Sequence, residues 1–179
     1  MTTIFRMMPF PTRRSHDNRR AAGDQPDASQ CLLFGLMDLC ICFQLLALHR
    51  HGIYTISTGE ITYCNAGHNP PYILKQDGST EVLPMPQDLL LGAIEGLEYH
   101  NMQMKLEPGE TLVMFTDGVN EAMNIEHEEF GDDRLEASLR KCAGLDCQHI
   151  IDTVKADVAE FVGEAEQSDD ITLFALKRK

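Results

Sequence analysis

The chain has 179 residues, of which 43% are hydrophobic and 24% are charged, the balance of one ordinary globular domain. Its formal net charge of −13 argues against nucleic acid and against an anionic membrane surface as the main partner, because both require a basic face. Its six cysteines include no Cys-x-x-Cys pair, which indicates free thiols in a reducing, cytoplasmic setting.

The first 52 residues differ from the rest in charge and pattern. Residues 1–52 carry a net charge of +2, whereas residues 53–179 carry −15. Residues 1–30 show no sustained hydrophobic period and are interrupted by prolines, so we expect loop or disorder there. We therefore expect two unlike parts, an atypical N-terminal segment over 1–52 and a coherent domain over 53–179.

The apolar stretch over 31–48 has two interpretations. A basic stretch followed by an apolar run resembles a signal anchor. However, Asp38 and Gln44 interrupt the run, and no uninterrupted piece approaches the roughly 20 residues that a spanning helix needs. We favour a buried helix of the globular domain, and we expect no membrane partner.

Two hairpins begin the coherent part. Short β-branched and aromatic runs flank a turn over 57–60, and a second pair of runs, 72–75 and 80–83, flanks an Asp-Gly turn over 76–79. Residues 99–106 alternate loosely, and residues 111–115 form a nearly continuous apolar run, which indicates a central strand.

Helices follow the predicted strands. Asp132 and Asp133 can cap a helix that carries Leu135, Leu139 and Ala143, and a second helix is predicted from about Asp146 to Val162. A last strand over 171–176 ends the chain. Hairpins first and helices afterwards predict an α+β fold with mostly antiparallel sheet.

Two acidic motifs are candidate metal ligands. Asp117 follows the predicted central strand directly, and Gly118 beside it permits a tight bend. Asp169 and Asp170 stand immediately before the final strand, and adjacent acids repel unless they are solvated, protonated or bridged by a cation. Each motif alone is equally compatible with a polar turn, but together they suggest an oxygen-ligand site for Mg²⁺ or Mn²⁺.

A third motif, Asn-Ala-Gly-His-Asn-Pro-Pro, covers residues 65–71. Its small residues allow close packing, and the proline pair stiffens the exit of the loop. His68 is compatible with a general acid or a ligand, although an ordering hydrogen bond is the interpretation we favour. Gly67, His68 and Asn69 are therefore predicted to form a structural motif.

These segments, in this order and spacing, resemble the SpoIIE/RsbU-type branch of the metal-dependent (PPM) serine/threonine protein phosphatases. The resemblance runs from about residue 53 to 176. It rests on the following blocks: Thr-Gly-Glu-Ile-Thr-Tyr-Cys-Asn-Ala-Gly-His-Asn-Pro-Pro over 58–71, Leu91-Gly92, Pro-Gly-Glu-Thr-Leu over 108–112, Phe-Thr-Asp-Gly-Val over 115–119, Glu-Phe-Gly over 129–131, and Asp-Asp-Ile-Thr-Leu over 169–173.

The resemblance implies a fold, a reaction and a partner. The fold would be a sandwich of two antiparallel β-sheets flanked by helices. Two Mn²⁺ or Mg²⁺ ions would activate a water that removes phosphate from phosphoserine or phosphothreonine on a partner protein, commonly an anti-sigma-factor antagonist. By position, Asp117 and Asp169 match metal ligands of the family, with Gly118 and Asp170 as their neighbours.

One block of the family has no match in this sequence. The family carries an earlier Gly-Asp-Val-Ser-Gly-x-Gly segment whose Asp bridges both metals, and Gly23-Asp24 lacks its following glycines. We therefore expect an N-terminally truncated or degenerate member whose sandwich is incomplete at the N-terminal side. The alternative to a phosphatase is a catalytically inactive remnant that acts only as a binding module.

Overall fold

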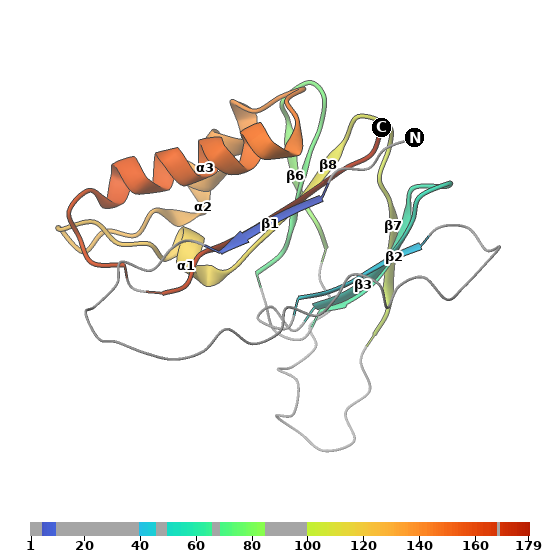
Figure 1. Ribbon diagram of the computed structural model, residues 1–179, viewed down its shortest axis with the longest axis horizontal. Helices are drawn as coiled ribbons and strands as arrows, with labels where there is room; N and C mark the ends of the chain where they lie inside the picture. Colours follow the sequence, from blue (N-terminus) through green and yellow to red (C-terminus); the bar gives the residue numbers. More distant parts are fainter. Residues whose placement is uncertain (1–4, 10–39, 46–49, 66–68, 85–99, 168) are drawn as a thin grey trace, which may run out of the picture.

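The computed structural model describes residues 5–9, 40–45, 50–65, 69–84, 100–167 and 169–179. They form two antiparallel sheets and helices, as Figure 1 shows, which confirms the expected α+β sandwich. The strands are β1 (Phe5–Pro9), β2 (Cys40–Leu45), β3 (Arg50–Thr55), β4 (Glu60–Asn65), β5 (Tyr72–Leu74), β6 (Thr80–Val82), β7 (Met102–Lys105), β8 (Thr111–Phe115) and β9 (Thr172–Lys177). The helices are α1 (Asp117–Asn120), α2 (Gly131–Arg140) and α3 (Cys147–Val162).

The strands divide between the two sheets in a simple order. One sheet has the order β1-β9-β8-β5-β6, and the other has the order β2-β3-β4-β7. Strand β8 lies at the centre of the first sheet, and all five of its residues are buried, as the apolar run predicted. Both expected hairpins are present, β3 with β4 and β5 with β6.

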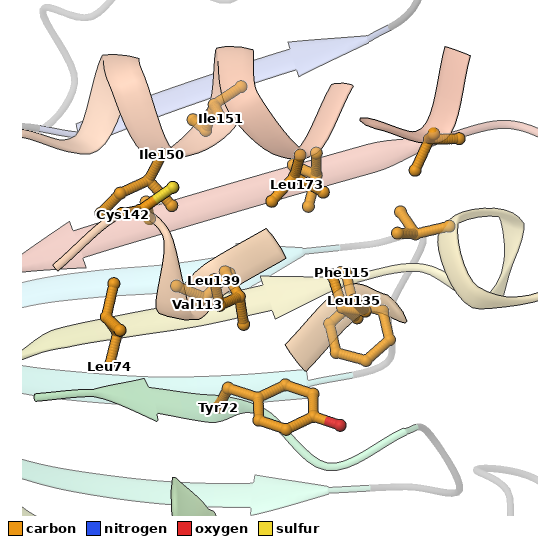
Figure 2. Packing of buried hydrophobic residues seen from close by; sticks show 14 of the residues in the cluster. Tyr72, Leu74, Val113, Phe115, Leu135, Leu139, Cys142, Ile150, Ile151 and Leu173 are labelled. Carbon is orange, nitrogen blue, oxygen red and sulfur yellow. The ribbon is translucent and has the colours of Figure 1, made fainter. Parts of the chain in front are cut away.

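One hydrophobic core lies between the first sheet and the helices. Side chains on one face of β5, β8 and β9 pack against α2 and α3, which cover this face in Figure 1. Figure 2 shows this packing from close by, with Leu135 and Leu139 of α2 facing Val113 and Phe115 of β8. Such interdigitated apolar burial is the main stabilising term of a fold.

A second core lies between the two sheets. Tyr54, Ile61 and Tyr63 of the second sheet pack with Leu112 and other side chains from the opposite face of the first sheet. Strands β5, β8 and β9 of the first sheet therefore have buried side chains on both faces, which explains why the sequence of β8 is continuously apolar rather than alternating.

The two long helices begin in different ways. Helix α3 begins as predicted, because the Asp146 carboxylate accepts a hydrogen bond from the backbone N–H of His149 at 3.0 Å. Helix α2 does not use an acidic cap. Its N-cap is Phe130, and Asp132 and Asp133 lie in its first turn, where their charges interact favourably with the helix dipole. Ala143 lies beyond the last residue of α2 and is exposed.

Two expectations for the N-terminal segment are wrong for the residues described. Residues 40–45 form strand β2, paired with β3, and not part of a buried helix. Phe5–Pro9, expected to be loop or disorder, form strand β1 beside β9. The rest of the predicted loop and helix lies outside the described residues. A helix long and apolar enough to cross a membrane does not occur among the residues described.

Candidate active site

The two acidic motifs meet at one end of the first sheet. Strand β8 ends at Phe115, and Asp117 is the first residue of α1. Strand β9 starts at Thr172, two residues after Asp170. Because β8 and β9 are antiparallel neighbours, with Phe115 paired to Leu173, the end of β8 and the start of β9 coincide in space. The topology thus brings together segments more than 50 residues apart.

Thr116 joins these two segments through its hydroxyl group. The Thr116 hydroxyl donates a hydrogen bond to the carbonyl oxygen of Asp170 at 2.9 Å. The hydroxyl oxygen of Thr116 also accepts a hydrogen bond from the backbone N–H of Thr172, again at 2.9 Å. The backbone N–H of Thr116 donates to the carbonyl of Thr172 at 3.1 Å. Three hydrogen bonds therefore hold the residue before Asp117 against the residues that follow Asp169.

Gly118 allows the segments to approach this closely. A Cβ atom built on Gly118 would lie 2.6 Å from the carbonyl oxygen of Asp170 and 3.3 Å from the carbonyl carbon of Asp169. A contact of 2.6 Å with backbone cannot be relieved by rotating a side chain. Only glycine fits this position without moving the Asp169–Asp170 backbone.

The three carboxylates of the site are exposed to solvent. An Asp117 oxygen accepts a hydrogen bond from the N–H of Gly118 at 3.1 Å, and an Asp169 oxygen accepts one from the N–H of Asp170 at 2.7 Å. These local bonds leave further lone pairs on both carboxylates open toward solvent. The structure thus places Asp117 and the Asp169–Asp170 backbone at the same end of the first sheet, and metal binding by these residues stays a prediction.

The third motif reaches the same place through Asn69. The Asn69 amide donates a hydrogen bond to the side-chain oxygen of Asn120, the last residue of α1, at 3.2 Å. The Asn120 amide in turn donates to an Asp132 oxygen in α2 at 3.2 Å. Gly67 and His68 lie outside the described residues, so their predicted structural role stays a prediction.

Two stacked aromatic rings lie next in sequence to the motifs of the candidate site. The rings of Tyr72 and Phe115 are stacked, with their centroids 5.9 Å apart. In the sequence, Tyr72 directly follows the third motif and Phe115 directly precedes Thr116. Burial raises the pKa of Tyr72 to about 12, and the negative charges of Asp132, Glu136 and Asp133 act in the same direction. This phenol therefore stays neutral at physiological pH.

The donor chemistry of the site fits a hard divalent cation. Carboxylate oxygens are the ligands that Mg²⁺ and Mn²⁺ prefer, and Mg²⁺ is commonly held by one or two carboxylates together with waters. Within the described part of the chain, no three His, Cys, Asp or Glu side chains converge closely enough to hold a metal alone. A cation held by carboxylates such as Asp117 and Asp169 would therefore need water or other oxygen donors to complete its coordination.

The long-range hydrogen bonds of two residues in this site have no recognisable signal in the sequence. Thr116 lies inside the Phe-Thr-Asp-Gly-Val motif over 115–119, but no local pattern marks its hydroxyl as a link to Asp170. Asn120 has no sequence signal of its own, because its partners Asn69 and Asp132 are 51 and 12 residues away. Only the tertiary arrangement identifies both.

One family model covers most of this chain. The model of the family described as Stage II sporulation protein E (SpoIIE) matches residues 42–179. The chain belongs to the SpoIIE family. The match begins within β2, and it includes all the acidic residues of the candidate site. Family membership supports a phosphatase function, and it confirms the resemblance found in the motifs.

Two curated relatives are similar over most of this chain. Protein IcfG of Synechocystis sp. is 32% identical over 127 residues, covering 71% of this chain and 20% of the relative. The phosphoserine phosphatase RsbU of Bacillus subtilis is 25% identical over 126 residues, covering 70% of this chain and 37% of the relative. The chain therefore spans between one fifth and somewhat over one third of these two relatives.

Solved structures show the same fold. The SiaA-PP2C domain of Pseudomonas aeruginosa has a TM-score of 0.61 at 24% identity, covering 73% of this chain and 51% of that one. The phosphatase domain of SpoIIE from Bacillus subtilis, presoaked with Mn, has a TM-score of 0.55 at 17% identity, covering 98% of this chain and 84% of that one. Among these structures of similar fold, RsbX is in complex with magnesium and the SpoIIE phosphatase domain was presoaked with Mn.

Proposed function

We propose that this chain is a metal-dependent phosphoserine/phosphothreonine protein phosphatase of the SpoIIE/RsbU type. The observation that carries the proposal is the junction of the two acidic motifs, in which Thr116 binds Asp170 and Gly118 lies against the same backbone. This junction holds Asp117 and Asp169 at one end of the sheet, where their exposed carboxylates can share a divalent cation.

The residues of the chain have separate roles in this proposal. Bound Mn²⁺ or Mg²⁺ would supply Lewis-acid stabilisation of phosphoryl oxygens and activation of a water. Asp117 and Asp169 would hold the metal, and the charge of Asp170 would add to the negative field beside it. Gly118 and Thr116 position the two carboxylates through the backbone. A protein nucleophile is not required.

The substrate we propose is a phosphorylated regulatory protein of the anti-sigma-factor-antagonist type. The support is the relative RsbU, whose name describes a phosphoserine phosphatase, and the family resemblance of the motifs. Such a partner would be met in the cytoplasm, so a cytoplasmic location belongs to the same proposal. The division of the chain into an atypical segment over 1–52 and the C-terminal part of a phosphatase domain over 53–179 stays a prediction, and the family match itself starts at residue 42, within β2.

Mn²⁺ titration and phosphopeptide hydrolysis test the proposal together. The chain should bind Mn²⁺ by calorimetry and release phosphate from a phosphoserine peptide only with Mn²⁺ or Mg²⁺ present. Asp117→Asn and Asp169→Asn should each weaken Mn²⁺ binding at least about tenfold. Asp152→Asn is the matched control, because Asp152 is an exposed residue of α3 that accepts a hydrogen bond from Gln148 in the same helix.

The two measurements separate two kinds of failure. Mn²⁺ binding that depends on Asp117 but is not accompanied by hydrolysis would leave a metal-binding module without phosphatase activity. Mn²⁺ binding that is the same in the wild-type protein and both variants would refute the assignment of the metal ligands.

A further inference from the structure

Helix α1, which begins with Asp117, is held at both of its ends by hydrogen bonds to other elements. At its start, Thr116 is bonded to Asp170 and Thr172. At its end, Asn120 accepts a hydrogen bond from Asn69 and donates one to Asp132. The helix is a single turn of four residues, so intrahelical hydrogen bonding alone cannot keep it in place.

From this arrangement we propose that Asn120 is a positioning residue for the metal ligand Asp117. The inference rests on the proposed function, since it assumes that Asp117 binds a divalent cation. Asn120 acts through the backbone of α1 and touches neither metal nor substrate. Its amide fixes the rotation of the turn, and that rotation sets the direction of the Asp117 carboxylate.

The chemistry of Asn suits this role because its side chain carries both an acceptor and a donor. Its oxygen faces the Asn69 amide, and its nitrogen faces the Asp132 carboxylate, each at 3.2 Å. Asn120 is half-buried and Asp132 is exposed. An Ala would remove both bonds, and an Asp would keep the first and place two carboxylates against each other.

Asn69 is itself well suited as an anchor. It precedes Pro70, which restricts its backbone to extended conformations. The following strand β5 pairs with β8, and Tyr72 stacks on Phe115. Asn69 therefore precedes a strand of the same sheet whose strand β8 leads into Asp117, so Asn69 and α1 are attached to one sheet.

Exchanging the side chains of Asn120 and Asp132 provides the sharpest test. Asn120→Asp alone should weaken Mn²⁺ affinity about tenfold, the size seen when residues that orient a metal ligand are lost. The double variant Asn120→Asp with Asp132→Asn restores both hydrogen bonds, because the carboxylate now on α1 accepts from Asn69 and from the amide now on α2. It also keeps the net charge, so its Mn²⁺ affinity should return to within about twofold of the wild type.

Asp132→Asn alone is the matched control. Its side-chain oxygen still accepts from Asn120, so Mn²⁺ affinity should change by less than about threefold although one negative charge is lost. The thermal midpoint of the metal-free protein is measured for every variant. A merely structural role would lower this midpoint in Asn120→Asp and leave the Mn²⁺ affinity of the folded protein unchanged.

The outcomes distinguish this inference from the proposed function. Weakened binding in Asn120→Asp together with recovery in the exchanged pair supports the positioning role. If Asp117→Asn weakens Mn²⁺ binding but Asn120→Asp does not, or if the exchanged pair fails to recover, the positioning role is wrong and the proposed metal site stands. If Asp117→Asn has no effect on Mn²⁺ binding, both are overturned.

Discussion

Gly118 and Asp170 are in closer contact than any residue with a side chain at position 118 would allow. The built Cβ position on Gly118 is 2.6 Å from the Asp170 carbonyl oxygen, which is itself fixed by the Thr116 hydroxyl. This contact joins segments 52 residues apart in the sequence and determines how closely the two acidic motifs can approach. It makes Gly118 a sensitive position in the candidate site.

Gly118→Ala should therefore disturb both stability and metal binding. The new methyl group must push the Asp169–Asp170 backbone away, and overpacking of this kind costs about 1–3 kcal/mol of unfolding free energy. Mn²⁺ affinity should fall about tenfold, because Asp169 moves with the displaced backbone. Urea denaturation and calorimetric Mn²⁺ titration measure the two effects.

Gly144→Ala is the comparison that separates stability from site geometry. Gly144 has a φ of 74°, where a side chain is strained, but a Cβ there would meet nothing within 4 Å. This variant should lose about 1 kcal/mol of unfolding free energy and keep its Mn²⁺ affinity. Equal Mn²⁺ affinities in the two Gly→Ala variants would contradict the role assigned to Gly118.

Thr116→Val tests the hydroxyl that joins the two motifs. Valine has almost the same shape, but it leaves the Asp170 carbonyl and the Thr172 N–H without this partner. The unfolding free energy should fall by about 1–3 kcal/mol, measured by urea denaturation. Thr116→Ser keeps the hydroxyl and should recover most of the loss, whereas a serine variant as unstable as the valine variant would show that the lost methyl packing is responsible.

Local patterns in the sequence are sufficient to predict most elements of residues 53–179. The turn residues over 57–60 and 76–79 identify both hairpins, and the Asp146 cap identifies the start of α3. The helix expected over 31–48 is wrong at 40–45 because a short apolar run has no period that separates a buried strand from a buried helix. Pairing with β3 decides this case, and pairing is not a local property.

Only part of the candidate site can be predicted from local sequence. Asp117 and Asp169 can be proposed from their places beside predicted strands. The bonds of Thr116 to Asp170 and of Asn120 to Asn69 cannot, because each depends on which strands become neighbours. A side chain whose only role is a long-range hydrogen bond leaves no periodic or spacing signal.

The contact between α2 and α3 contains a buried hydroxyl and an acid whose effect depends on pH. Ser138 is buried, and its hydroxyl lies 2.5 Å from an Asp157 oxygen, which Lys141 also contacts at 2.8 Å. Burial acts to raise the pKa of Asp157, but the hydrogen bonds from Lys141 and Ser138 outweigh it and hold the pKa below its usual value. The ionised form of Asp157 is thus favoured by folding.

Asp157→Asn should therefore be more costly at neutral than at acid pH. A lowered folded pKa means that the stabilisation is fully present above the ordinary Asp pKa of about 4 and is lost as pH falls through the folded value. The difference in unfolding free energy between wild type and variant should be constant from about pH 6 to 8 and shrink below about pH 4. Denaturation curves that stay equally separated at about pH 3 would contradict this origin.

The stabilisation that depends on Tyr72 is lost at alkaline rather than acid pH. Its folded pKa is raised to about 12, chiefly by burial and also by nearby carboxylates, whereas the ordinary tyrosine value is 10.0. The stabilisation linked to the neutral phenol is therefore fully present below about pH 10 and is lost as pH rises through about 12. The protein should lose unfolding free energy over this interval, because the unfolded chain releases the proton more readily than the folded one.

Tyr72→Phe isolates this contribution, because it keeps the stacking on Phe115 and has no proton to lose. Urea denaturation between about pH 8 and about pH 11.5 should show the wild type losing more unfolding free energy than the variant. Burial also raises the pKa values of Tyr54 and Tyr63, and both residues titrate in both proteins. Only the difference between the two curves therefore reports on Tyr72, and parallel curves over this interval would show that its phenol is not shielded by the fold.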